Sequence, residues 1–197
     1  MQKVYLFLNI LICVALISFT PVKNAELNRD EAKKAFEYLN QFRANPKEFG
    51  DKLKLNLKKV DTRPALVWNE TLAKVAEERA MDMAENKYFS HVNKKGQGVN
   101  ILIHEAGYSL PKSWLKNKQD NFFESIQAGA KDGIDAINDL IIDKGTESLG
   151  HRKHLLGMDD KQAFNSKLKD IGIGFVTCKK GCQYISYTCV IIAMQEK

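Results

Sequence analysis

The sequence predicts an α+β fold in which a small antiparallel sheet lies between two layers of helices, a three-layer α-β-α sandwich. Helical periodicity dominates residues 28–156, whereas residues 169–194 contain two runs rich in β-branched and aromatic residues. Strands that follow the helices and are apolar on both faces need helices on both sides to bury them. The chain of 197 residues is long enough for one such domain with a full hydrophobic core.

The first 25 residues are typical of an export signal. Lys3 supplies a positive start, and residues 4–19 are almost continuously apolar. We therefore predict a signal peptide over 1–25, a mature domain over 26–197, and a secreted protein, extracellular or periplasmic. Lys23 occupies the third position before the cut, where a small residue is usual, so an uncleaved anchor is the alternative. The apolar run is shorter than the ~20 residues that span a bilayer, which favours cleavage and no stable membrane span.

Two helices are predicted in the first half of the mature chain. Asn28 is a cap residue followed three positions later by Glu31, and this helix ends before Pro46. Its apolar residues recur at helical spacing: Ala32, Ala35, Phe36, Leu39 and Phe42. Asn69 can cap the second helix, whose apolar stripe is Leu72, Val75, Ala76, Ala80 and Met83. Its solvent-exposed side is predicted to carry Glu77, Glu78, Arg79 and Asp82.

The middle of the chain contains more residues that interrupt regular secondary structure. Glycines and a proline predict that residues 94–120 are mostly loop, with one helical turn before Ala106. Residues 122–128 can form a short strand or a turn. Residues 132–143 predict a third helix that Gly145 stops, and residues 151–156 a fourth, short one.

The last part of the chain predicts a β-hairpin that contains all the cysteines of the mature domain. Residues 169–178 and 183–194 are rich in Ile, Val, Phe, Tyr and Thr and flank a short turn with glycine. Three cysteines cannot all pair, so at least one thiol is left over. A Cys178–Cys182 bridge would staple the turn and leave Cys189 as a buried thiol, whereas a Cys178–Cys189 bridge across the strands is the alternative.

Charge excludes one class of partner. The formal net charge is +6, and loss of the signal would lower it to +4 because two lysines and no acids lie there. Basic residues are interleaved with acids and form no concentrated patch, so we expect no nucleic-acid binding. The densest basic run, residues 52–59, alternates lysine with leucine and favours a solvated face over a membrane-surface role.

Four motifs are more specific: Leu66-Val67-Trp68-Asn69, Phe89-Ser90-His91, Gly150-His151-Arg152-Lys153 and Asp170-Ile171-Gly172-Ile173-Gly174-Phe175. Together they resemble the CAP superfamily, the cysteine-rich secretory, antigen 5 and pathogenesis-related-1 proteins, in its cysteine-poor, bacterial-type SCP-like branch. The resemblance extends from about Asn28 to Met194 and implies the CAP-type α-β-α sandwich.

The resemblance also implies a site in which four side chains meet in an open cleft, here His91, Glu124, Asp143 and His151. Two imidazoles and two carboxylates suit a divalent cation, zinc first, with a position left open for water. Members of the family have been associated with cation binding through the two histidines. The alternative is that the four groups only hydrogen bond to one another and hold the loops on the sheet.

The resemblance implies an extracellular binding or interaction module whose partner is a protein, a lipid or a small molecule. Some family members bind sterols or fatty acids in apolar grooves, so a sterol or lipid binder is one alternative. The aromatic residues then form core or cleft wall: Trp68, Tyr108, Trp114, Phe122 and Phe123. A metal-assisted protease or esterase is the other alternative, with catalytic residues unassigned. Ser90 and Ser125 adjoin predicted site residues, and His154 lies three positions after His151, where it either packs or supports a metal ligand from behind.

Overall fold

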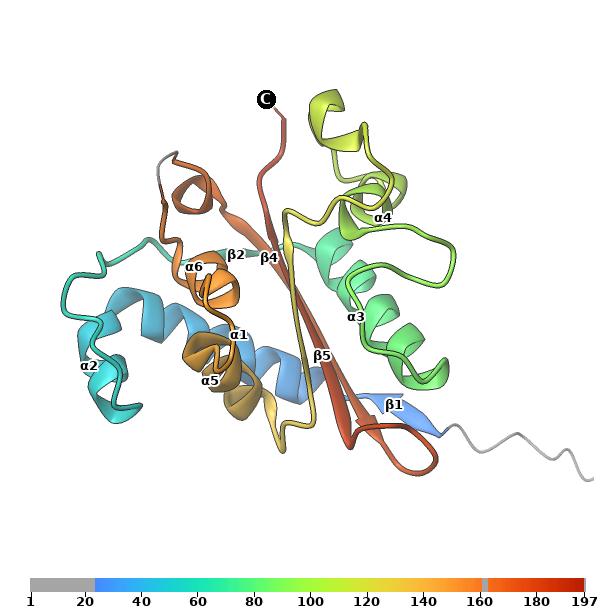
Figure 1. Ribbon diagram of the computed structural model, residues 1–197, viewed down its shortest axis with the longest axis horizontal. Coiled ribbons are helices and arrows are strands. Elements are labelled where there is room, and N and C mark those ends of the chain that lie inside the picture. The colour runs from blue at the N-terminus through green and yellow to red at the C-terminus, as the bar shows by residue number, and fades with distance from the viewer. Residues whose placement is uncertain (1–23, 161–162, 197) are drawn as a thin grey trace, which may run out of the picture.

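The computed structural model in Figure 1 describes residues 24–160 and 163–196. All but the last two residues of the predicted signal peptide lie outside this part of the chain. The helices are α1 (Arg29–Ala44), α2 (Pro46–Lys52), α3 (Glu70–Glu85), α4 (Val99–Glu105), α5 (Gly133–Ile142) and α6 (Gly150–Leu156). The strands are β1 (Ala25–Leu27), β2 (Val67–Trp68), β3 (Glu124–Ala128), β4 (Asp170–Cys178) and β5 (Ser186–Ala193). Two 3₁₀ turns cover Lys112–Leu115 and Asn165–Lys167.

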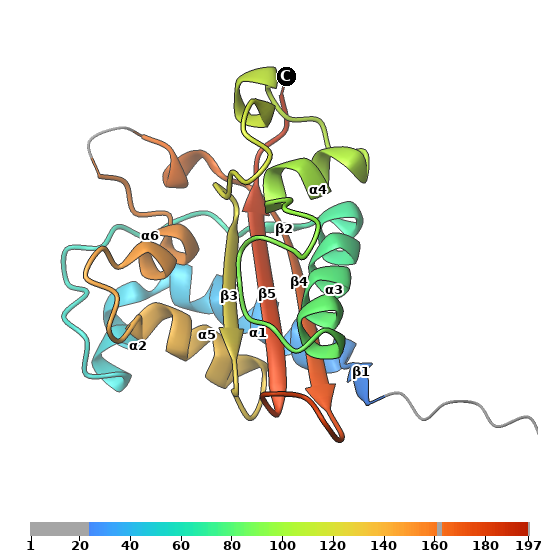
Figure 2. The same cartoon turned by 45° about the vertical axis from the view of Figure 1, so that its right-hand side comes forward.

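The elements form the predicted three layers. The sheet separates α3 and α4 on one side from α1, α2, α5 and α6 on the other, as Figures 1 and 2 show. Buried apolar side chains from both helical layers and from the sheet form one core cluster. None of the described helices has the length and apolar content that a membrane span requires.

The sheet has the order β1-β4-β5-β3, with these neighbours antiparallel. The predicted hairpin is β4 and β5, and the segment predicted as strand or turn is β3. Two short strands that the pattern did not predict pair with the outer edge of β4. Ala25 of β1 lies opposite Cys178 at one end, and Val67 of β2 pairs in parallel with Asp170 at the other.

Local signals account for the starts of α1, α2, α3 and α5. The side chains of Asn28, Asn69 and Asp132 each accept a hydrogen bond from the backbone amide three residues later, at 3.2, 3.1 and 2.8 Å. Pro46 ends α1 as predicted, but it also begins α2, because proline at the first helical position has the required φ and no N–H to satisfy. The sequence analysis did not predict this helix.

Two glycines of β4 set the distance between α3 and the sheet. A Cβ atom on Gly172 would lie 2.1 Å from the backbone nitrogen of Ala73, and one on Gly174 would lie 2.3 Å from the carbonyl oxygen of Ala76. No side chain fits there, because real Cβ contacts below 3.0 Å essentially do not occur. The glycines therefore let α3 lie with its backbone against β4, which brings the side chains of α3 close to β3 and β5.

The hairpin ends in the first of the two predicted disulfide pairings. Cys178 is bonded to Cys182 around the turn, and Cys189 is a free thiol buried in the middle of β5.

Candidate functional site

His91 and His151 come from opposite sides of the sheet and lie side by side. His91 is in the loop after α3, and His151 is in the first turn of α6. Their ring centroids are 6.2 Å apart and the rings are tilted by 32°. Both side chains reach solvent, with exposed fractions of 39% and 28%. Two imidazoles at this distance are within reach of one ion, because Zn–N bonds are ~2.0–2.1 Å long.

The first half of the site pairs His91 with Glu124 of β3. His91 Nδ1 lies 2.9 Å from Glu124 Oε2, and the Glu124 side chain is fully buried. Arg79 of α3 donates from Nε to the other carboxylate oxygen at 2.8 Å. Cys189 donates its thiol proton to the same oxygen at 3.4 Å. Glu124 is therefore buried behind His91, and both of its carboxylate oxygens have hydrogen-bond partners.

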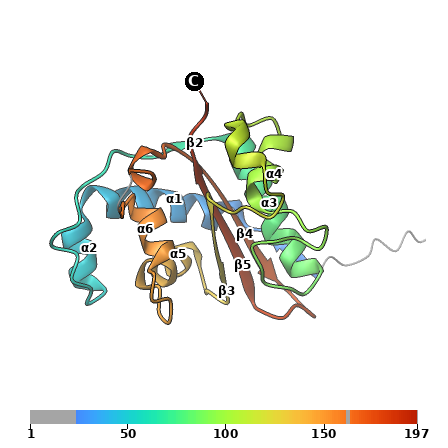
Figure 3. The same cartoon turned by 45° about the horizontal axis from the view of Figure 1, so that its top comes forward.

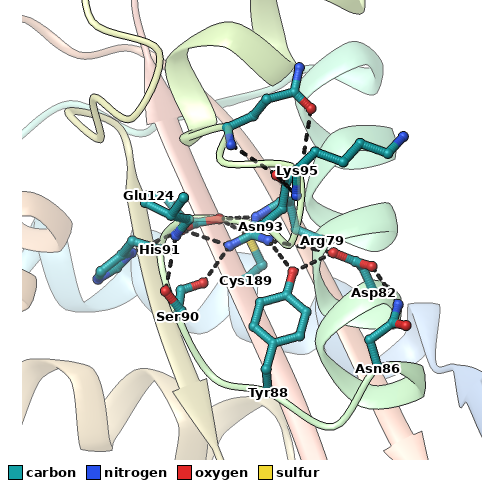
Figure 4. A network of polar contacts seen from close by, with 12 residues as sticks. Arg79, Asp82, Asn86, Tyr88, Ser90, His91, Asn93, Lys95, Glu124 and Cys189 are labelled. Atoms are coloured by element: carbon teal, nitrogen blue, oxygen red, sulfur yellow. Dashed lines mark hydrogen bonds and ion pairs between the residues drawn. The ribbon is translucent and has the colours of Figure 1, made fainter.

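Arg79 also fixes the loop that carries His91. Its Nη1 donates to the Tyr88 hydroxyl at 2.9 Å and its Nη2 to the carbonyl oxygen of Ser90 at 2.7 Å (Figure 4). The Tyr88 hydroxyl in turn donates to Asp82. One guanidinium thus ties the carboxylate partner of His91 and the residue before His91 to the same helix.

The prediction that Arg79 is solvent-exposed is wrong, because its side chain is only 3% exposed. The reason is electrostatic: a carboxylate as deeply buried as Glu124 needs a charged, hydrogen-bonded partner. The sequence did contain a signal for this position. Arg79 lies seven residues after Leu72 and four before Met83, in register with the apolar stripe of α3.

The pKa shifts of this half agree with an ion pair. Burial alone would raise the pKa of Glu124, but the His91 hydrogen bond and the Arg79 charge outweigh it and hold the pKa below its usual value. Burial likewise acts to lower the pKa of Arg79, and Glu124 raises it above the usual value. Burial raises the pKa of Cys189 well above that of a free thiol, with the Glu124 charge adding to it. Glu124 is therefore an anion that accepts hydrogen bonds from its neighbours.

The second half pairs His151 with Asp143, and its charge is stabilised by backbone amides. Asp143 Oδ1 lies 2.8 Å from His151 Nδ1, and Oδ2 accepts the amides of His151 and Arg152 at 3.0 and 3.3 Å. Burial acts to raise the pKa of Asp143, but the His151 bond and the Arg152 amide hold it below its usual value. Asp143 follows α5 directly with φ of 54°, a left-handed conformation that aspartate adopts more readily than most residues.

Arg152 holds α5 and α6 together beneath this half. Its Nε and Nη2 donate to the carbonyl oxygens of Ile141 and Ile142, at 2.6 and 2.7 Å. These are among the last carbonyls of α5, which have no partner within the helix. The Arg152 contacts thereby fix the angle at which α6 presents His151.

His154 is a packed histidine. Its Nδ1 lies 2.8 Å from Ser125 Oγ and its Nε2 3.3 Å from the carbonyl oxygen of Ile192. Burial lowers the pKa of His154 to about 4, so the ring is neutral at physiological pH. Ser125 is buried with it, and the exposed Ser90 accepts a hydrogen bond from the Val92 amide. Neither serine is an accessible nucleophile beside a base, so the geometry gives a serine hydrolase no support.

The structure thus brings together all four predicted side chains, as two histidine–carboxylate pairs. Since both carboxylates are anionic acceptors, each neutral ring donates from Nδ1 and keeps its lone pair on Nε2. No hydrogen bond among the described residues uses the Nε2 atom of His91 or His151. Within the same residues, no group of three or more His, Cys, Asp or Glu side chains is arranged to hold a metal. The protein therefore offers two imidazole ligands, with Glu124 and Asp143 behind them.

A three-layer sandwich with paired histidines beside its sheet is the arrangement that the resemblance to SCP-like domains implies. The family model described as Cysteine-rich secretory protein family, CAP, matches residues 36–191, and the chain belongs to this family. It is thereby an SCP-domain module, as the resemblance predicted.

Two solved structures are similar to this chain. An outer surface protein from Borrelia burgdorferi is 20% identical, with 84% of this chain and 96% of that chain covered and a TM-score of 0.50, and it shares the fold. An extracellular protein containing an SCP domain from Bacillus anthracis str. Ames is 21% identical, with coverages of 86% and 45% and a TM-score of 0.48. The chain thus spans less than half of the Bacillus protein. None of the curated proteins compared matches this chain.

Proposed function

We propose that this CAP protein acts outside the cell as a binding module in which His91 and His151 hold a divalent cation, zinc first. The observation that carries the proposal is the paired geometry, with each Nδ1 hydrogen bonded to a buried carboxylate and the two rings 6.2 Å apart. Carboxylates behind histidines orient the rings of metal-ligating histidines and raise their basicity. The residues present therefore fit an imidazole-binding cation.

The number of ligands indicates what such an ion does. Catalytic zinc sites have three protein ligands, whereas His91 and His151 supply two. Water or an oxygen atom of a bound partner would complete the coordination, and the ion would polarise that atom as a Lewis acid. Such a site suits reversible recognition of a partner that brings its own donor atom, in keeping with a binding module.

Two further observations support an extracellular location. The Cys178–Cys182 disulfide belongs to an oxidising compartment. The family to which the chain belongs is a secretory one, and the sequence predicts a signal peptide over residues 1–25.

Calorimetric titration of the purified protein with zinc tests the cation site. We expect saturable binding at pH 7.5 that is lost at pH 5.5, because only neutral imidazole binds metal and protons compete for Nε2. His91→Ala and His151→Ala should each abolish binding. His104→Ala is the matched control, since His104 is an exposed histidine of α4 that contacts neither ring.

Two results would contradict the proposal. If zinc gives no binding heat and no shift in unfolding temperature at pH 7.5, the four residues form a structural cluster and not a cation site. Zinc binding that survives both site variants but not His104→Ala would place the ion elsewhere.

A further inference from the structure

A second site lies at the edge of β4, away from the histidine pair. β1 covers this edge at residues 176–178 and β2 covers it at residues 170–171. On this edge, residues 172–175 between them have no neighbouring strand in the described chain. Helices α1 and α3 lie on either side of β4 (Figure 3). The groove between them has a volume of about 1060 Å³, and neither His91 nor His151 lines it. This volume is that of a pocket for a small organic ligand.

The floor of the groove is apolar and aromatic. Phe36 and Trp68 meet edge to face with their ring centroids 5.4 Å apart, and both are only half-buried. Met81 and Leu27 also line the groove and add to its apolar surface. Large side chains left half-covered in a concave surface offer apolar area that a ligand can bury, at ~25 cal/mol per Å².

The rim is acidic, although the protein as a whole is basic. Six carboxylates and three basic side chains line the groove, whereas the whole chain has a formal net charge of +6. Arg29 is occupied by Glu77, with bonds of 2.7 and 2.8 Å. Glu70, Glu78 and Glu85 form no ion pair with any described residue. The local charge is therefore opposite in sign to that of the protein.

We propose that this groove binds a cationic amphiphile, a small molecule with an apolar body and one positively charged amine. The apolar body would cover Phe36, Trp68 and Met81, and the amine would lie at the rim beside one of two carboxylates that pair with no described residue, Glu70 or Glu78. Aromatic faces attract cations, so Trp68 favours the same charge as the carboxylates do. An anionic amphiphile of the same length would place its head group near carboxylates of the same charge. This repulsion makes the rim favour the cationic ligand over the anionic one.

Trp68 makes the proposal directly measurable. It is one of two tryptophans, so in a Trp114→Phe background the fluorescence of the full chain reports on the groove. Decyltrimethylammonium and decanoate, both below micelle formation, are the probes because they share a ten-carbon apolar body and differ in head-group charge. We expect saturable binding of the cation, at least about tenfold tighter than that of decanoate, with the difference shrinking in high salt. If Trp114→Phe fails to fold, calorimetry on the unmodified protein gives the same comparison.

Substitutions then locate the ligand. Glu70→Gln combined with Glu78→Gln should weaken cation binding about twofold to fivefold, because it removes both carboxylates that can pair with the amine and one solvent-exposed charge pair is weak. Glu48→Gln with Asp51→Asn is the matched control, because it removes two exposed carboxylates from α2 outside the groove. The proposal is overturned if decanoate binds as tightly as the cation, if neither probe binds, or if His91→Ala rather than the glutamate pair removes binding.

Discussion

The two halves of the histidine site achieve the same geometry by different means. The Nδ1–carboxylate distances are 2.9 Å for His91–Glu124 and 2.8 Å for His151–Asp143. Glu124 is neutralised by the side chain of Arg79, which is 45 residues away in the sequence and on the helical layer next to the sheet, whereas Asp143 accepts hydrogen bonds from backbone amides eight and nine residues ahead. One half therefore depends on a buried ion pair between layers, and the other on a local turn. Removal of one charge should therefore cost much stability in the first half, whereas loss of the carboxylate in the second half should cost less.

Removal of the Arg79 charge is the largest expected effect. Arg79→Met leaves the Glu124 carboxylate buried without its cation, and breaking a buried pair in this way costs ~3–5 kcal/mol. Urea unfolding followed by circular dichroism measures the loss. The double variant Arg79→Met with Glu124→Gln is the control and should recover part of it, because no unpaired charge is left. A loss below ~1 kcal/mol for Arg79→Met would show that this half does not depend on the ion pair.

Mild acid tests a group that belongs to neither half. The pKa of buried His154 is lowered to about 4, whereas histidine in the unfolded chain titrates near ~6.5. Between these values the unfolded state binds a proton that the folded state does not. Stability is therefore full above pH ~6.5 and falls by up to ~3 kcal/mol as the pH drops to about 4. The lowered pKa values of Glu124 and Asp143 act in the same direction but only below about pH 4.5.

Chemical unfolding at a series of pH values measures this slope. His154→Gln should flatten the curve between pH 6.5 and 4.5, whereas His104→Gln, an exposed histidine, should not. An unchanged slope in His154→Gln would mean that the acid-sensitive group lies elsewhere.

Truncation of Asp143 is expected to have a smaller effect than loss of Arg79. Asp143→Ala removes the acceptor of two amides and of His151, and the loss of a helix-start acceptor costs ~0.5–2 kcal/mol. Asp143→Asn keeps an acceptor and tolerates the left-handed backbone, so it should cost less. Thermal unfolding of both variants measures how much stability each one loses. If Asp143→Ala were as damaging as Arg79→Met, the local turn would matter as much as the buried pair.

The same contrast explains what the sequence could predict. Caps, the hairpin and the two histidine motifs are local signals, and the structure has each of them. β1, β2 and α2 are too short to show periodicity, and the two strands exist only because β4 has an edge to pair with. Arg79 stood in the apolar stripe of α3, but charged residues are rarely buried without a partner, and its partner lies on another element. The pairing of Arg79 with Glu124 was thus visible only in three dimensions.

The last expected effect is on the affinity for the cation proposed for the two histidines. Loss of a carboxylate behind a metal-ligating histidine typically lowers metal affinity ~10-fold to 100-fold. Asp143→Asn should lower zinc affinity toward the lower end of that range, because the amide oxygen still accepts from His151 Nδ1. Glu124→Gln should lower it more, since the neutral amide also leaves the buried Arg79 charge unbalanced and frees the 88–91 loop that Arg79 holds. Calorimetric zinc titration at pH 7.5, with circular dichroism to confirm that each variant is folded, separates the two. Equal losses in both variants would mean that the carboxylates orient the two rings equally well, and that the buried pair contributes to stability but not to the site.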